Sequence, residues 1–342
     1  AELGFDAWWP SDRLAVRGYF EVLRHYRGIK RIRDQLGDRL LAAPPEVFVG
    51  VDAPDFNLGL EKRLKAAGIR SVHFVCPSIW AWRGGRARRM AESCDHVLCL
   101  FPFEPALLRE HGLAATFVGH PLADAIPLDP PRAASRAALG LGEHDAVVAV
   151  LPGSRRSEIQ YNAPVFLQAV ARLHRERPVL RFVLPLAPGL RPLVEPMLAE
   201  HAPGVPLQLL DGQSHAALAA CDVTLIASGT ATLEAALFKR PMVIGYRIHA
   251  LSWQIMRHMR YQPWIGLPNI LSRDFVVPEL LQDDCTPDAL ARAVLAWLDD
   301  LPAAERLARR FRDLHHQLRQ DTARRASDAI AEVLAAKPPQ RA

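Results

Sequence analysis

Two short stretches place polar side chains between an apolar run and a predicted helix. The first, AVVAVLPGSRRSEIQYN at 146 to 162, breaks at a Pro-Gly pair and continues with Ser154 and Arg155. A strand, a glycine turn and a helix start leave backbone N–H groups facing one spot, and arginine adds a permanent cation. This predicts an anion site. An ordinary connection capped by Ser154 or Ser157, with solvated arginines, explains the pattern equally well.

The second stretch is IASGTATLEAAL at 226 to 237. Ser228 and Thr230 offer hydroxyls, and Gly229 allows close approach to the backbone. Glu234 lies one helical turn after Thr230, on the same face. Its carboxylate could accept both hydroxyls of a ribose while the helix N-terminus holds phosphate, or it could reach back and cap its own helix. Together the two turns predict a diphosphate-linked ligand.

A third candidate is Asp52 in VGVDAPDFN, where a predicted strand ends. Loop carboxylates at this position reach the ligand cleft of an open α/β sheet, so Asp52 is predicted to be a general base. The alternative role, a turn or helix-capping aspartate, fits Asp55 better. His120 in VGHP and Asn269 in LPN also lie at strand or loop ends, where lone polar residues are usually turn formers.

The segment 14 to 33 has a basic amphipathic pattern. Such a pattern is typical of a helix on a membrane surface, but also of a helix packed on its own domain. Its apolar side comprises Val16, Phe20, Leu23 and Tyr26.

Short apolar runs that alternate with helical patterns must position these residues. Runs without period-2 alternation are typical of parallel strands buried on both faces. We therefore predict an α/β fold with two Rossmann-like doubly wound domains, at 1 to 140 and 141 to 300, and C-terminal helices over 301 to 342. Ligands would bind in a cleft at the carboxyl ends of the strands. The first half has only about four predicted strands, so we expect its domain to be N-terminally truncated.

The length, charge and cysteine spacing of the chain argue against several classes of protein. A chain of 342 residues usually forms two domains, and a net charge of +5 suits a phosphorylated or anionic-lipid partner. No arginine-rich tail is present, which argues against nucleic acid, and no G-x-G-x-x-G follows a strand, which argues against a dehydrogenase. Five cysteines without C-x-x-C spacing indicate buried thiols in a reducing compartment. No apolar run is long enough for a membrane span, so a soluble or peripheral protein is expected.

Seven motifs in order resemble lipid-A-disaccharide synthase, a family of GT-B glycosyltransferases: VGVDAPDFN, PSIWAWR, VGHPLAD, LPGSRRSEI, ASGTATLEAAL, PMVIGYR and LPNIL. The resemblance implies a peripheral enzyme on the cytoplasmic face of the bacterial inner membrane. It transfers 2,3-diacylglucosamine from its UDP derivative to 2,3-diacylglucosamine 1-phosphate, forming the β-1,6-linked lipid A precursor and UDP. No metal or cofactor is implied, because arginine and a helix dipole stabilise the departing UDP.

The resemblance also implies residue roles. Asp52 is the general base on the acceptor 6-hydroxyl, Arg155 contacts the diphosphate or the acceptor phosphate, Glu234 binds the ribose, and Asn269 lies in the active site. Further substrate-binding residues are Ser154, Ser228, Gly229, Thr230, His120 and Tyr246. A patch for membrane and acyl chains comprises Val16, Phe20, Val22, Leu23 and Tyr26.

The sequence leaves open two alternative functions and the placement of the final helices. The family begins with a strand and a G-E-x-S-G-D loop, and this chain starts after them, so an inactive fragment that binds lipid surfaces is one alternative. Another UDP-sugar enzyme of the GT-B fold, including an epimerase, is a second. The final helices, 303 to 325, are expected either to pack back on the first domain or to exchange between the subunits of a homodimer.

Overall fold

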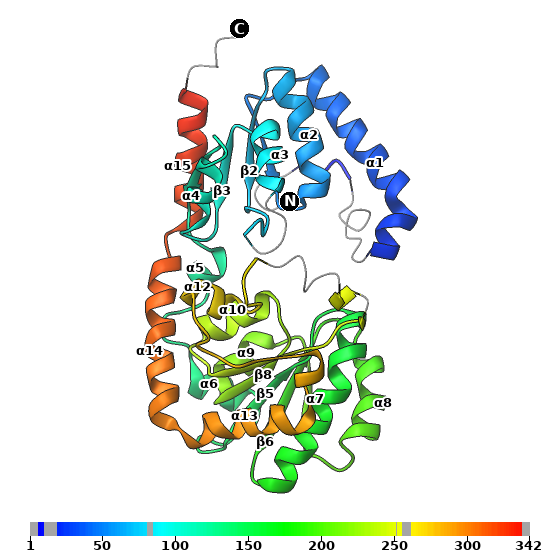
Figure 1. Cartoon of the computed structure of the whole chain (residues 1–342), viewed down its shortest axis with the longest axis vertical. Helices are drawn as coiled ribbons and strands as arrows, with labels where there is room; N and C mark the ends of the chain where they lie inside the picture. The colour runs from blue at the N-terminus through cyan, green and yellow to red at the C-terminus, as the bar shows by residue number, and fades with distance from the viewer. Residues whose placement is uncertain (1–5, 10–18, 81–84, 251, 255–260, 337–342) are drawn as a thin grey trace. The chain divides into compact units, whose positions relative to one another are not determined.

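The computed structural model describes residues 6 to 9, 19 to 80, 85 to 250, 252 to 254 and 261 to 336, without the side chains of 19 to 25. It divides into two compact units (Figure 1). The first comprises Ala1–Gly119 and Thr322–Ala342, and the second comprises His120–Asp321.

The first unit contains four parallel strands in the order β1-β2-β3-β4. Its strands are β1 (Val47–Val51), β2 (Arg70–Phe74), β3 (His96–Cys99) and β4 (Ala114–Phe117). Its helices are α1 (Tyr19–Ala42), α2 (Pro54–Ala66), α3 (Gly85–Ser93), α4 (Glu104–Arg109) and α15 (Thr322–Ala335). The central strands β2 and β3 are mostly buried, as expected of parallel strands covered on both faces, whereas the edge strands β1 and β4 are partly exposed.

The last helix completes the first unit. Ala329 of α15 is buried in one core with Val72 of β2 and Leu98 of β3, and Figure 1 shows α15 beside β3. Helix α1 packs on α2 at its C-terminal end, where Leu40 and Leu60 belong to another apolar cluster. The first unit thus combines segments that lie far apart in the sequence.

The second unit contains six parallel strands in the order β10-β9-β8-β5-β6-β7. Its strands are β5 (Val147–Leu151), β6 (Arg181–Leu186), β7 (Leu207–Asp211), β8 (Val223–Ile226), β9 (Met242–Tyr246) and β10 (Glu279–Leu281). Its helices are α5 (Pro121–Ala125), α6 (Arg132–Ala138), α7 (Arg156–Glu176), α8 (Arg191–His201), α9 (Ser214–Ala220), α10 (Thr230–Leu237), α12 (Leu267–Ser272), α13 (Pro287–Asp299) and α14 (Leu301–Leu318), with a 3-10 turn, η2 (Gln282–Asp284).

This unit begins earlier than the expected boundary at residue 140. The reason is Arg136 of α6, which is almost fully buried. Its Nε donates to the Ala220 carbonyl at 2.9 Å, and its Nη2 pairs with Asp222 at 2.9 Å. Helix α6 is therefore fixed to the second unit, ahead of the expected boundary.

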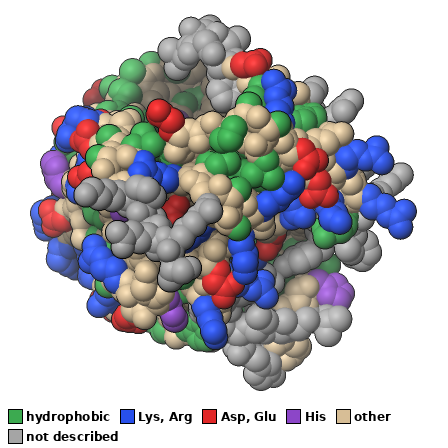
Figure 2. Space-filling view, turned by 90° about the horizontal axis from the view of Figure 1, so that it is seen from above, with side chains coloured by type: hydrophobic (Ala, Val, Ile, Leu, Met, Phe, Trp, Pro, Cys, Tyr) green, Lys and Arg blue, Asp and Glu red, His purple; other side chains and the backbone are tan. Residues whose placement is uncertain are grey.

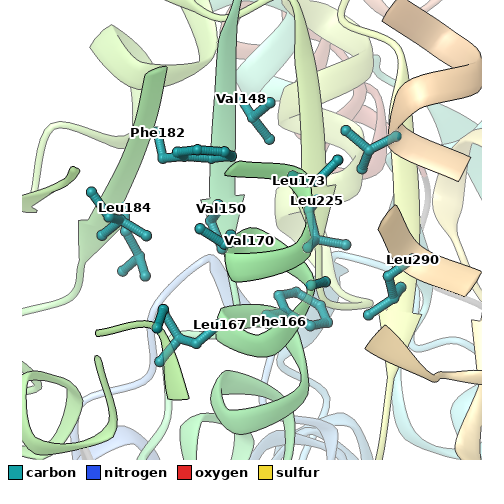
Figure 3. Close-up of a cluster of buried hydrophobic side chains, with 14 of the residues drawn as sticks. Val148, Val150, Phe166, Leu167, Val170, Leu173, Phe182, Leu184, Leu225 and Leu290 are labelled. Carbon is teal, nitrogen blue, oxygen red and sulfur yellow. The ribbon is translucent and has the colours of Figure 1, made fainter. Parts of the chain in front are cut away.

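The core of the second unit forms around β5, which is buried along its whole length. Figure 3 shows Val148 and Val150 of β5 beside Phe166 and Val170 of α7, with Leu290 of α13 in the same cluster. Burial of such side chains contributes about 1.5 to 3 kcal/mol each. It fixes β5 and α7, and with them the turn that joins the two elements.

The surface carries charges of both signs (Figure 2), and the thiols are buried. Lys and Arg side chains are interspersed with Asp and Glu over the face in Figure 2. Within the described ranges, no helix combines the length and apolarity needed to cross a membrane. All five cysteines are free and buried, as their number and spacing predicted.

Candidate active site

The two predicted turns emerge side by side from neighbouring strands. Strand β5 pairs with β8 in parallel, and Leu151 is the register partner of Ile226. The pairing continues past the strand ends, because the Ala227 N–H donates to the Leu151 carbonyl at 2.8 Å. Both turns therefore lie at one edge of the sheet, where open α/β sheets bind ligands.

Glu158 closes the first turn. Its Oε2 accepts the backbone N–H groups of Ser154 at 2.9 Å and of Arg155 at 3.3 Å. Helix α7 consequently begins at Arg156. The expectation that these two N–H groups face an anion is corrected, because a carboxylate of the same helix already accepts both. Glu158 follows the N-cap Arg155 by three positions, which is capping-box spacing and was the available signal.

Arg155 remains available as a cation beside this turn. Its Nη1 lies 2.9 Å from Glu158 Oε1, and its side chain is 60% exposed. An exposed ion pair of this kind contributes little, about 0 to 1 kcal/mol. The guanidinium can therefore leave Glu158 for a phosphate at small cost.

The second turn is the more open of the two. Gly229 has φ 143 and ψ −166, a conformation almost confined to glycine, and a Cβ there would meet nothing within 4 Å. Thr230 is exposed and begins α10. Because the first N–H groups of a helix lack intrahelical partners, this helix start can accept an anion. Ser228 is committed elsewhere, since its hydroxyl donates to the Ile265 carbonyl at 3.3 Å.

Glu234 contacts a residue of a neighbouring helix. Its Oε2 lies 3.4 Å from Nε2 of His215 on α9, and its side chain is 20% exposed. The capping alternative for Glu234 is therefore not what the structure contains. His215 was not predicted, because a contact between separate helices leaves no local pattern.

Tyr246 ends β9 close to the start of α7. Burial raises the pKa of its phenol, the Glu158 carboxylate raises it further, and Arg155 opposes the change. Asn162 links the two elements: its Oδ1 accepts the Arg247 N–H at 2.7 Å, and its Nδ2 donates to the Glu158 carbonyl at 2.8 Å. This buried amide was also missed by the sequence reasoning.

Asn269 requires a correction. The residue is fully buried, and its Nδ2 donates to the Val277 carbonyl at 2.9 Å and to Glu279 Oε1 at 2.8 Å. Its Oδ1 accepts the N–H groups of Val276 and Val277 at 2.9 and 3.0 Å. An amide makes four hydrogen bonds at most, so none remains for a substrate. In this structure Asn269 fixes the segment that leads into β10.

His120 is likewise a structural residue in its described contacts. It is the N-cap of α5, and its Nδ1 accepts the Leu122 N–H at 3.1 Å. Burial lowers the pKa of the ring to about 4, with Asp124 opposing, so the imidazole is neutral at neutral pH. The predicted substrate contact by His120 stays a prediction.

Asp52 follows β1 in the first unit with its side chain exposed. Its backbone has φ 49, Ala53 has φ 43, and Val75 after the adjacent β2 has φ 80. Left-handed conformations cost non-glycine residues free energy and cluster at functional sites. Asn57 stabilises this turn, because its Nδ2 donates to the Asp52 carbonyl at 2.8 Å and to the Val51 carbonyl at 3.2 Å.

The Asp52 carboxylate is open to a substrate. Within the described part of the chain, no hydrogen bond or ion pair engages it. Asp55 differs, because it pairs with Arg86 at 2.8 Å. Neither aspartate is the N-cap of α2, which is Ala53.

The predicted membrane patch is only partly visible. Val16 lies outside the described residues, as do the side chains of Phe20, Val22 and Leu23. Tyr26 is 54% exposed on α1.

One group of metal-ligand type occurs among the described residues. Atoms of Cys76, Cys99 and Glu104 lie within 4.8 Å of one another in the core of the first unit. Glu104 is already engaged, since its Oε1 accepts the Trp80 Nε1–H and its Oε2 accepts the Phe101 N–H, both at 3.0 Å.

Comparison with known proteins identifies the family. The family model described as lipid-A-disaccharide synthetase matches residues 1–333. The chain belongs to the lipid-A-disaccharide synthetase family. A curated relative, the lipid-A-disaccharide synthase of Verminephrobacter eiseniae, is 57% identical over 340 residues, which cover 98% of this chain and 87% of the relative. This member of the synthetase family is therefore a glycosyltransferase of lipid A biosynthesis, as the motifs predicted.

Solved structures of low identity show the fold of this synthetase family member. A putative UDP-N-acetylglucosamine 2-epimerase from Listeria monocytogenes has a TM-score of 0.63 at 14% identity, covering 92% of this chain and 82% of that chain. The UDP-GlcNAc 2-epimerase from Neisseria meningitidis, bound to UDP-GlcNAc, has a TM-score of 0.59 at 13% identity, covering 94% and 82%. The predicted GT-B fold is confirmed.

Proposed function

We propose that this chain transfers 2,3-diacylglucosamine from its UDP derivative to 2,3-diacylglucosamine 1-phosphate, releasing UDP. Family membership supports the reaction, and the pair of turns after β5 and β8 carries the proposal for the donor site. Both turns leave the same edge of one sheet, with a cation, an open helix start and a carboxylate among their residues.

In the second unit, each group has a part in holding UDP. The start of α10 at Gly229 and Thr230 accepts a phosphate through its backbone N–H groups. Arg155 exchanges Glu158 for the diphosphate, and Glu234 accepts ribose hydroxyls. Charge on the departing UDP is stabilised by groups that are already placed, and such stabilisation typically supplies several kcal/mol.

In the first unit, Asp52 is the proposed general base. It removes the proton from the acceptor 6-hydroxyl, which attacks the anomeric carbon from the face opposite UDP, so the anomeric configuration inverts. The carboxylate is exposed and unpaired among the described residues, and Asn57 fixes the backbone that carries it. Both features suit a base that must meet a mobile substrate.

The acceptor and the donor carry acyl chains, so we also propose that α1 lies on a membrane surface. The exposed Tyr26 and the apolar residues Phe20, Val22 and Leu23 of its N-terminal half support this, with Val16 just ahead of it in the sequence. The homodimer and the location on the inner face of the inner membrane stay predictions.

Calorimetry of UDP binding tests the donor site. We expect the parent chain to bind UDP and the Arg155→Ala, Glu234→Ala double variant to lose at least about 100-fold in affinity, since two charged contacts are removed. The control is Arg175→Ala, Glu176→Ala, which removes the same residue types from the exposed end of α7. Unchanged binding by the first double variant would place UDP elsewhere.

A further inference from the structure

His215 contacts Glu234, the proposed ribose-binding residue, from a neighbouring helix. Strand β7 ends at Asp211, Gln213 turns the chain with φ 59, and α9 then begins at Ser214. The second residue of α9 is therefore presented beside α10, with which α9 is in contact.

The His215 ring is held by two contacts from α10 and the residue that follows it. Its Nε2 lies 3.4 Å from Glu234 Oε2. Its face tilts by 59° against the ring of Phe238, with 5.3 Å between the ring centroids. Phe238 is buried, so packing fixes its ring, and this ring restricts the orientation of the His215 imidazole. The His215 side chain itself is 52% exposed, which leaves part of the ring open toward solvent.

The two carboxylate oxygens of Glu234 have different surroundings. Oε2 lies nearest the imidazole, and among the described residues no hydrogen bond or ion pair engages Oε1. A carboxylate free to rotate loses conformational freedom when it binds a hydroxyl, and a neighbour that fixes its orientation beforehand reduces this cost. An imidazole nitrogen 3.4 Å from one oxygen does this through an electrostatic contact with the carboxylate.

We propose that His215 is a positioning residue for nucleotide binding: its Nε2–H holds Glu234 Oε2, so that Oε1 faces the ribose hydroxyls of UDP. The inference rests on the proposed function, because it takes Glu234 as the ribose contact. His215 acts through Glu234 and touches none of the reacting atoms.

Calorimetry with UDP and with 2′,3′-dideoxy-UDP tests this role. In His215→Phe the ring on Phe238 is kept and the N–H donor is lost, so we expect UDP to bind roughly five- to tenfold more weakly, the effect of one hydrogen bond. Binding of the dideoxy nucleotide should not change, because it has no ribose hydroxyls to present.

His215→Gln retains an N–H donor and should bind UDP within about twofold of the parent. The control His144→Phe alters an exposed histidine of the same unit and should leave both affinities unchanged.

Two results would overturn the inference alone. One is parent-like UDP affinity in His215→Phe, and the other is an equal loss for both nucleotides, which would mean a general packing role. Glu234→Gln separates these results from failure of the proposed function. If Glu234→Gln binds UDP as tightly as the parent, the ribose assignment fails and the role of His215 fails with it.

Discussion

Asp52 has an open carboxylate on a strained turn, so it allows the clearest experiment on a single residue. We expect Asp52→Asn to reduce turnover by at least about 100-fold while UDP affinity stays unchanged, because the amide cannot accept the acceptor proton. Product formation by chromatography and UDP calorimetry measure the two quantities.

Asp55→Asn is the matched control for Asp52→Asn. Asp55 lies in the same loop, and its 86% exposed carboxylate pairs with Arg86. An exposed ion pair contributes about 0 to 1 kcal/mol, so turnover should stay within about twofold. Near-normal turnover in Asp52→Asn, or an equal loss in both variants, would contradict the assignment of the base.

Glu104 gives a prediction for pH. Burial raises the pKa of its carboxyl from 4.5 to about 7, opposed by the hydrogen bonds from Phe101 and Trp80. Between pH 4.5 and 7 the folded state then binds more protons than the unfolded state. The contribution of the protonated Glu104 carboxyl to stability is therefore present at low pH and is lost as pH rises toward 7. The loss is roughly 3 kcal/mol at most. Denaturant unfolding from pH 4.5 to 7.5 should show this decline in the parent and not in Glu104→Gln.

The control for this pH dependence is Glu110→Gln, the same change at an exposed residue. It should keep the decline of the parent. Parallel stability curves for the parent and Glu104→Gln would show that Glu104 is not the group that titrates.

At the scale of elements, the turn between β8 and α10 depends on a conformation that only glycine adopts readily. Gly229→Ala meets no steric neighbour, so its cost comes from φ 143 alone, about 1 to 3 kcal/mol of unfolding free energy. Because relaxation of this strain moves the start of α10, UDP affinity should fall by at least about tenfold. Chemical denaturation and calorimetry measure the two effects.

Gly204→Ala provides a comparison for the turn. Gly204 has φ 73 and equally open surroundings in the same unit. We expect it to lose about 1 kcal/mol of stability with no change in UDP affinity. If both variants weakened UDP binding equally, strain anywhere in the unit would explain the effect, and the turn would have no special role.

At the scale of the whole molecule, each unit has its own sheet and core, and the first unit is completed by the last helix of the chain. Ala329→Glu buries a charge between α15 and the strands β2 and β3. We expect a loss of at least about 3 kcal/mol from the first unit. UDP binding by the second unit should persist. Unfolding followed by fluorescence, together with calorimetry, would measure both.

Ala323→Glu is the control for α15, because this alanine is exposed on the same helix. Its effect on stability should stay within about 0.5 kcal/mol. If Ala329→Glu unfolded both units together, their stabilities would be coupled, contrary to the division into two units.

The fold class, the family and most strands could be predicted from the amino-acid sequence. Strands buried on both faces need continuous apolar runs, and such runs are visible without a structure. Strand β10 was not predicted, because its three residues are only partly buried and too few to form a pattern. The two turns of the second unit were also found from sequence, since a strand followed by glycine, hydroxyls and a helix is a local signal.

Which polar side chains stay available for a ligand could be seen only in the folded protein. Asn269 and His120 have the residue types of a site, but their described partners are backbone groups and a carboxylate of the protein, including the Val277 carbonyl and the Leu122 N–H. The contact of His215 with Glu234 joins two helices, and the adjacency of the two turns depends on the pairing of β5 with β8. Hydrogen bonding and burial depend on distances in space between residues far apart in the chain, so local spacing cannot specify them.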